Sequence, residues 1–397
     1  MVKTLLFLTA ALLSAGAQAQ PSQAGTGERA IVVTGQPISD YRARLATCLA
    51  RHCPPNEDID ASLALAEALF VQGEYHDARR TLLSSISRNH RHRRGYAEPV
   101  SDLYRANARV ARHLGLDRDA EYSTWEVLRT LRAGLPTEDH RHFTARLEVA
   151  QSLARFGHRY YDSQRELRRL MELAREAGRD DVVAMAELRI LWLDYLQGPY
   201  RAPPSTAMLE MARSPDPRRS IGARTMLVRI YSRRRETARA EALIAELGRS
   251  GQRRALLFSP PYELVQQEHP FLDAMLQRLA MEGRLRTGSN LANRMVDNFD
   301  DKWIDVGFWV DPEGRVEGLE VVRQRNDAAW ARPLLQSIRG RRYAASDART
   351  YRLERYTYTS GYRDGSGTHA QQRSPAARVE YFDLSEGATA PSSPTTQ

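Results

Sequence analysis

The sequence has few lysines, few cysteines and no long hydrophobic run beyond its first twenty residues. Of its 58 basic residues only Lys3 and Lys302 are lysines, and its two cysteines are Cys48 and Cys53. No later stretch approaches the roughly 18 consecutive apolar residues that a membrane-spanning helix needs. These absences exclude a cysteine-rich scaffold and a polytopic membrane protein.

Recognised catalytic motifs are absent as well. The chain has no P-loop, no serine nucleophile elbow and no H-E-x-x-H motif. Histidine pairs at His90 and His92, and at His140 and His142, are spaced i, i+2, so they do not converge on one helix face. We therefore predict a non-enzymatic protein with no catalytic residues, no metal site and no cofactor.

The N-terminus has the pattern of a cleavable export signal. Lys3 supplies a positive start, Leu5 to Ala17 is apolar, and Ala17-Gln18-Ala19 fits the small-x-small cleavage rule. We predict a signal peptide at residues 1–19 and a periplasmic mature chain without a transmembrane anchor. An uncleaved N-terminal anchor is the alternative.

The formal net charge is +9, and almost all of the positive charge is arginine. A basic surface attracts anionic envelope surfaces and acidic partners. Export argues against nucleic acid, so we expect protein or peptide partners in the cell envelope and peripheral contact with anionic surfaces.

The two cysteines are five positions apart in TCLARHCPP. In an oxidising compartment this spacing permits one local disulfide between Cys48 and Cys53. The bridge requires the helix to end between them, which Pro54 and Pro55 favour. A metal site would need more ligands than His52 offers, and a redox pair is more often spaced C-x-x-C.

From residue 58 to residue 252 apolar residues recur three and four positions apart, which predicts consecutive helices. A spaced pattern of a glycine, a residue two positions later and an alanine five positions later also recurs. Glycine ends one helix of a pair, and alanine lets the next helix pack closely. The members are Gly73, Tyr75 and Ala78; Gly115, Asp117 and Ala120; Gly157; Gly198; and Arg235, Thr237 and Ala240, where arginine replaces glycine.

Residues 63–86, LALAEALFVQGEYHDARRTLLSSI, resemble a tetratricopeptide repeat. The resemblance implies a TPR-like α-solenoid of helix hairpins over residues 58–252, of the kind that binds peptides or partner domains. An irregular helical bundle is the alternative. Before the array we predict a flexible leader at residues 20–57, and after it a linker at residues 253–292 with a capping helix from Phe271 to Glu282.

The hydrophobic period changes to two after residue 302. Ile304, Val306, Phe308 and Val310 share one face of a strand, and Trp303, Asp305 and Trp309 share the other. The turn Asp311-Pro312-Glu313-Gly314 predicts a hairpin, and Gly318 a bulge in the second strand. A helix from Arg332 to Arg339 follows, and then alternating runs around Tyr351 to Tyr358 and in ARVEYFDL.

This β-β-α-β order resembles the C-terminal domain of TonB-type energy transducers. Asp311, Gly314 and Val316 match its D-x-x-G-x-V turn, and Arg342-Tyr343 matches the end of its helix segment. The resemblance implies a TonB-C-like α+β domain at residues 293–384 that accepts an extended peptide by strand addition. The Pro-rich spacer and uncleaved membrane helix of those transducers are missing, so we do not predict a complete motor. We expect a disordered tail at residues 385–397.

The leader contains Ile31-Val32-Val33-Thr34-Gly35, which resembles the TonB box of TonB-dependent receptors. The resemblance implies that Ile31, Val32, Val33 and Thr34 add as a strand to a sheet edge. We place that edge at Tyr351, Leu353 and Arg355, in the same chain, in another copy or in a separate TonB. A leader without such a role is the alternative.

The predicted fold class is thus α+β, mainly α. The predicted function is a periplasmic binding or scaffold protein, linked to TonB-dependent transport. The alternative is an envelope enzyme, or enzyme subunit, acting on cell-wall or glycan material. A converging carboxylate pair or a set of metal ligands would favour the alternative, and the sequence shows neither.

Overall fold

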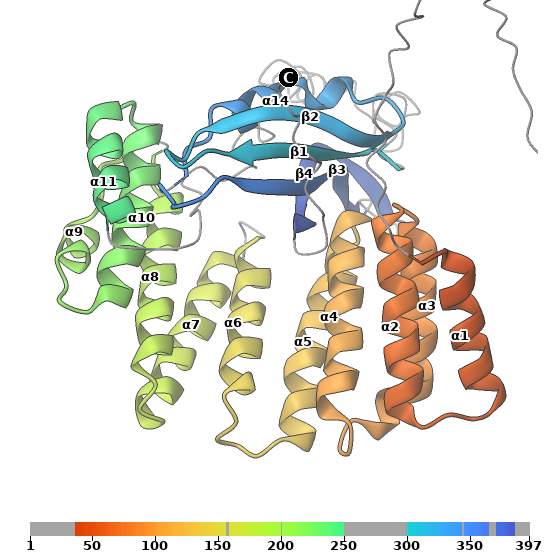
Figure 1. The fold of residues 1–397 in the computed structure, drawn as a ribbon. Coiled ribbons are helices and arrows are strands. Elements are labelled where there is room, and N and C mark those ends of the chain that lie inside the picture. The colour runs from red at the N-terminus through yellow and green to blue at the C-terminus, as the bar shows by residue number, and fades with distance from the viewer. Residues whose placement is uncertain are drawn as a thin grey trace, which may run out of the picture. The chain divides into compact units, whose positions relative to one another are not determined.

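A computed structural model describes residues 36–155, 159–199, 201–249, 299, 301–343, 345–364 and 371–385. All of them belong to one compact unit. They form a mainly helical structure followed by a small antiparallel sheet, which confirms the predicted α+β class (Figure 1). No helix within these ranges is long and apolar enough to cross a membrane. The predicted signal peptide, the segment Ile31 to Thr34, Gly157, the capping helix with its linker and all but the first residue of the predicted tail lie outside the described residues.

The helices follow one another in chain order and pack as neighbouring hairpins (Figure 1). Their bounds are α1 Ile38–Ala50, α2 Pro55–Val71, α3 Tyr75–Asn89, α4 Ala97–His113, α5 Asp117–Gly134, α6 Arg141–Ala154, α7 Tyr160–Glu176, α8 Asp180–Gln197, α9 Thr206–Ala212, α10 Pro217–Arg233 and α11 Thr237–Arg249, with a short 3-10 helix at His90–His92.

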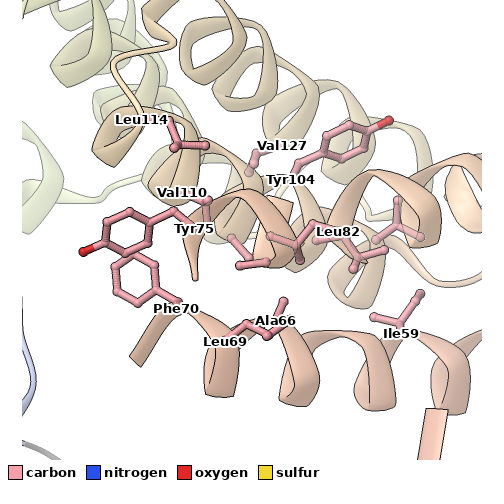
Figure 2. Close-up of a cluster of buried hydrophobic side chains, with 14 of the residues drawn as sticks. Ile59, Ala66, Leu69, Phe70, Tyr75, Leu82, Tyr104, Val110, Leu114 and Val127 are labelled. Atoms are coloured by element: carbon pink, nitrogen blue, oxygen red, sulfur yellow. The ribbon is translucent and has the colours of Figure 1, made fainter. Parts of the chain in front are cut away.

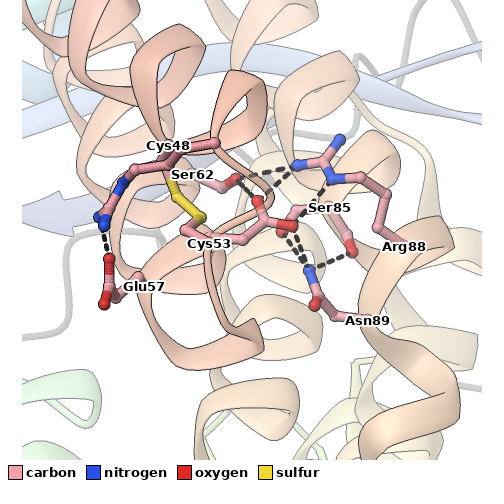
Figure 3. Close-up of a disulfide and its surroundings, with 9 residues drawn as sticks. Cys48, Cys53, Glu57, Ser62, Ser85, Arg88 and Asn89 are labelled. Carbon is pink, nitrogen blue, oxygen red and sulfur yellow. Dashed lines mark hydrogen bonds and ion pairs between the residues drawn. A yellow bond between two sulfur atoms is a disulfide. The ribbon is translucent and has the colours of Figure 1, made fainter.

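The first helix, α1, corrects the predicted leader. Residues 38–57 form α1 and the start of α2, and Ile38, Tyr41 and Leu45 pack against the helical core. The helix ends at Ala50, between the two cysteines, and the structure joins Cys48 to Cys53 in a disulfide with a Cα–Cα distance of 5.2 Å (Figure 3). The sequence prediction missed α1, although Ile38, Tyr41, Leu45 and Cys48 recur three and four positions apart.

A buried acidic residue, Asp58, ties α2 to α3 through Arg88 and Asn89, which are labelled in Figure 3. It accepts hydrogen bonds from Arg88 at 2.6 and 2.8 Å, from Asn89 at 2.7 Å and from Ser62 at 3.0 Å. Burial favours the neutral carboxyl, but the hydrogen bonds and charge of Arg88 outweigh it and hold the pKa of Asp58 below its usual value.

The predicted glycine turns have a common geometry. Gly73 and Gly115 have φ values of +81° and +74°, and the residue after each glycine donates a backbone hydrogen bond to the carbonyl five positions earlier, at 2.8 Å. Arg235 adopts the same left-handed conformation, with φ +62°, so the prediction of an equivalent turn without glycine is confirmed. Gly198 is different: its φ is −79°, and the chain runs on through a loop to α9.

The largest core cluster joins α2, α3, α4 and α5 (Figure 2). Its members are fully or almost fully buried, and each apolar side chain of this size contributes about 1.5–3 kcal/mol by leaving water. They include Ile59, Leu69, Phe70, Tyr75, Leu82, Val110 and Val127. The three- and four-residue spacings of the sequence place these side chains on the facing sides of the helices.

The sheet has the strand order β2-β1-β3-β4, with every pair antiparallel. Its elements are β1 Trp303–Val310, β2 Val316–Arg325, β3 Thr350–Asp364 and β4 Gln371–Asp383, with a 3-10 turn at Ala329–Ala331 leading into helix α14, Arg332–Arg339. The predicted hairpin turn is present, with Gly314 at φ +79°. The predicted bulge is also present, at Gly318, where φ is +58° and the β1–β2 register shifts.

The two faces of β1 pack differently. Ile304, Val306, Phe308 and Val310 form a core with Leu334 and Ile338 of α14, as the alternating pattern predicts. On the other face Trp303 is 5% exposed and belongs to the helical core cluster, and Asp305 has no exposed surface. The sheet is therefore buried on this side by the helices.

Candidate binding site

The residues predicted to form an open sheet edge lie in an interior strand. Tyr351, Leu353 and Arg355 belong to β3, which pairs with β1 on one side and with β4 on the other. The Leu384 N–H donates to the Leu353 carbonyl at 2.8 Å, and the Leu353 N–H donates to the Ser385 hydroxyl at 3.1 Å. The prediction of a free edge at Tyr351 to Tyr358 is wrong, because β4 folds back and occupies it.

The predicted peptide-binding side chains serve the fold instead. Arg355 is fully buried and donates to both carboxylate oxygens of Asp305, at 2.7 and 2.9 Å. The ring of Tyr351 packs on Trp309 with a centroid distance of 5.1 Å, and Leu353 is 5% exposed. The other half of the predicted pair, Ile31 to Thr34, lies outside the described residues.

Arg355 also attaches the sheet to the end of α2. Its guanidinium donates to the carbonyls of Phe70 and Val71, at 2.6 and 2.7 Å. The last carbonyls of a helix have no hydrogen-bond partner within the helix, and the helix dipole gives this end a partial negative charge. A buried arginine supplies both the missing donors and a positive charge. Asp305 holds this guanidinium and also accepts from Arg323 at 2.8 Å.

A second set of contacts ties β3 and β4 to α3, α4 and α5. The Thr357 hydroxyl lies 2.8 Å from both the Tyr75 hydroxyl and His113 Nδ1. Complete burial and the nearby arginines lower the pKa of His113 well below its usual value, so its ring is neutral. Arg378 of β4 donates to Asp117 at 2.7 Å, at the start of α5.

The helices also form a groove with a cavity volume of about 470 Å³, lined mainly by α2, α4 and α6, with further residues from α3 and α5. Its apolar lining includes Leu63, Ala66, Phe70, Ala106 and Val110, and its charged lining includes Glu67, Asp102, Arg105, Arg109, Arg112, Glu148 and Arg155. We call this surface the groove. The apolar side chains that form its floor are, apart from Leu63, buried in the helical core, and seven charged side chains surround them.

Three arginines of α4 face this groove at spacings of four and three. Arg105 is neutralised, because it pairs with Asp102 at 2.9 Å and with Glu148 at 3.1 Å. Arg109 packs against two neighbouring aromatic rings, 5.4 Å from the centroid of Phe70 and 4.8 Å from that of Phe382. Burial lowers the pKa of Arg109, and the charge of Glu67 opposes that shift.

Arg112 is the third arginine. Its guanidinium forms no hydrogen bond or ion pair with any described residue. Burial, together with the positive charge of nearby Arg155, lowers the pKa of Arg112 to about 10, and Glu380 opposes this shift. The spacing that produces this stripe is visible in YRANARVARH, but sequence reasoning missed it because the groove exists only when α2 and α6 lie beside α4.

The structure offers little for metal chemistry within its described ranges. Cys48, Cys53 and Glu57 are the group with metal-ligand spacing. The two sulfurs are bonded to each other, so neither is a thiolate ligand in this state.

No protein-family model matches the chain, and no curated protein matches it. A solved structure, BtubC (BKLC) from P. vanneervenii, is similar over 53% of this chain and 88% of its own length. Its sequence identity is 14% and its TM-score is 0.39. Likeness at this level defines neither a fold family nor a function.

Proposed function

We propose that this protein is a non-catalytic binding or scaffold protein of the cell envelope, which holds an extended segment of a partner protein in the groove. The observation that carries the proposal is the groove itself. It combines a floor of apolar side chains, most of them buried in the helical core, with two arginines whose charges no described carboxylate neutralises by direct contact. Side chains of a bound segment would contact the exposed part of this floor, at Leu63, and pair with these arginines.

The attachment of the sheet supports a partner that reaches beyond the helices. Phe382 of β4 lies against Phe70, with a centroid distance of 5.1 Å, and Glu380 of β4 pairs with Arg155 at 3.0 Å. A chain leaving the groove therefore meets β4. This arrangement suits a scaffold in which helices and sheet contact one partner.

The second part of the proposal is strand addition, which the TonB resemblance implies. Because β3 is an interior strand, we propose that the added strand pairs with an outer strand of the sheet. Among the described residues the outer strands are β2 and β4. Both are interrupted, β2 by the bulge at Gly318 and β4 by Pro375, which has no N–H to donate. An added strand would be short, so the groove is the principal site. On the basis of the predicted export signal and the TonB resemblance, we propose that this activity belongs to the periplasm and is linked to TonB-dependent transport.

Site-directed photo-cross-linking tests the proposal. A photoreactive residue at Gln151, an exposed position in the groove, is compared with one at Tyr161, which is 77% exposed on α7 and lies outside the groove. In envelope extract we expect Gln151 to capture one defined envelope protein and Tyr161 not to capture it. Equal capture from both positions, or no capture from Gln151, would contradict the proposal.

A further inference from the structure

We propose that the groove recognises the carboxylate side chains of an acidic partner segment through Arg109 and Arg112. This inference rests on the proposed function, because it names the chemistry of the segment that the groove holds. It also gives the two arginines a binding role that the fold does not require of them.

The distribution of ion pairs in the groove is the first support. Arg105 pairs with two carboxylates, Asp102 and Glu148, and Arg155 pairs with Glu380, so that with Glu67 the four arginines are matched by four carboxylates overall but not by direct contact. Arg109 and Arg112 remain without an ion pair to any described residue. Glu67, an exposed residue, acts on Arg109 only through its charge. Two cationic groups in one groove thus retain the capacity to bind anions.

The second support is the fixed position of Arg109. Its guanidinium packs against the rings of Phe70 and Phe382, and its terminal nitrogens form no hydrogen bond with any described residue. A ligand carboxylate would accept hydrogen bonds from these nitrogens, and arginine–carboxylate hydrogen bonds are stronger than neutral ones. Because the two rings already order the side chain, little side-chain entropy is lost when the ligand binds.

The third support is the position of Arg112 relative to Arg109. The two residues are three apart on α4 and lie on the same side of the helix. Their guanidinium groups can therefore meet carboxylates on one extended segment. The partly exposed side chain of Leu63 lines the same groove and would contact an apolar residue of the segment that alternates with the acidic ones.

These features favour a protein segment over a lipid surface. A bilayer is flat and engages arginines that project from a surface, whereas Arg109 and Arg112 are partly buried in the lining of a groove. A peptide of alternating character reaches both the apolar floor and the two arginines.

Fluorescence anisotropy with the full-length mature protein tests this inference. The probe is a fluorescein-labelled nonapeptide of alternating Glu and Leu residues, and its neutral partner carries Gln in place of Glu. The variant replaces Arg109→Gln and Arg112→Gln. A matched control replaces Arg165→Gln and Arg169→Gln, which removes the same charge from exposed positions of α7 outside the groove. Lysine at both groove positions separates charge from packing, and circular dichroism verifies that each variant folds.

We expect the wild type to bind the Glu peptide at least tenfold more tightly than the Gln peptide. This preference falls to within twofold in the groove variant, is partly retained in the lysine variant and is unchanged in the control. Equal binding of the two peptides to the wild type would overturn the carboxylate inference and leave groove binding intact. The inference is also overturned if neither peptide binds, if the groove variant keeps the preference, or if phosphatidylglycerol vesicles bind the wild type and displace the probe. In each case the cross-linking experiment decides the proposed function separately.

Discussion

Single arginine residues act in two ways in this protein. Arg355 is buried and hydrogen-bonded to Asp305, and although burial favours its neutral form, these contacts raise its pKa. Arg112 is only partly buried and makes no such contact, and its pKa is lowered. The two shifts have opposite signs because only the first guanidinium has its counter-charge in place. The first arginine therefore stabilises the fold, and the second is available for a ligand.

Substitution of Asp58 tests the acid dependence of stability. Because the folded-state pKa of Asp58 is lowered, its contribution is present above the unfolded pKa near 3.8 and is lost as the pH falls through the folded pKa. We expect Asp58→Asn to reduce the free energy of unfolding at pH 7 by about 1–3 kcal/mol. Urea titrations from pH 7 down to about pH 3 measure the effect. The wild-type advantage should shrink below about pH 4, and an advantage independent of pH would contradict this assignment.

Substitution of Arg355 tests the attachment of the sheet to the helices. Arg355→Met leaves Asp305 buried with Arg323 as its only cationic partner and frees the carbonyls of Phe70 and Val71. We expect a loss of about 3 kcal/mol in the free energy of unfolding. Hydrogen exchange measures it, and protection should fall together in the C-terminal turn of α2 and in β3. A loss confined to one of these elements would contradict the described contact.

At the scale of helices and turns, the glycines in the left-handed conformation fall into two groups, those with a neighbouring element packed against them and those without one. A Cβ at Gly73 would collide with the ring of Trp303, and one at Gly115 would collide with the Ser360 carbonyl. Gly178 has the same left-handed conformation, with φ +64°, but has open space around it. Gly73 and Gly115 are thus required both for the turn and for the approach of the sheet.

Alanine at each of these glycines separates the two requirements. Gly178→Ala should cost about 1 kcal/mol, because only the backbone conformation is unfavourable. Gly73→Ala and Gly115→Ala should cost at least about 2 kcal/mol, since the side chain also displaces a packed neighbour. Thermal unfolding of the three variants measures the difference. Equal losses of stability in all three variants would show that the sheet does not pack closely against these turns.

The revised position of β3 yields a prediction about the leader. Deletion of residues 30–35 should leave amide exchange in Leu353 and Arg355 unchanged, because β1 and β4 already flank β3. If the leader adds a strand within the chain, protection should instead fall in β2 or β4. Reduced protection of β3 after the deletion would contradict the strand order described above.

Local sequence patterns predicted most helices and strands but not which of them pack or pair with each other. The periods of 3.6 and two located the helical hairpins, the turn at Asp311 and the helix at Arg332–Arg339. The pairing of β4 with β3 was not predicted. The alternating pattern in ARVEYFDL indicates a strand, but it does not specify the strand with which that segment pairs. The burial of Asp305 was not predicted, because its counter-charges, Arg323 and Arg355, are distant in sequence.

At the scale of the whole molecule, the groove could not be predicted from the sequence alone. It is lined by residues of α2, α3, α4, α5 and α6, and no single helix contains it. The stripe of Arg105, Arg109 and Arg112 was visible, but its meaning depends on which carboxylates neutralise each arginine. Only the packed structure distinguishes the paired Arg105 from the unpaired Arg112.

One measurement tests the central claim that the groove holds a partner through its two unpaired arginines. The yield of the Gln151 cross-link in envelope extract is compared between Arg109→Gln/Arg112→Gln and Arg165→Gln/Arg169→Gln, which carry the same net charge. We predict that the groove variant loses at least four-fifths of the captured partner, as expected for removal of charge-assisted hydrogen bonds, and that the control retains the wild-type yield. Equal yields in the two variants would contradict the claim.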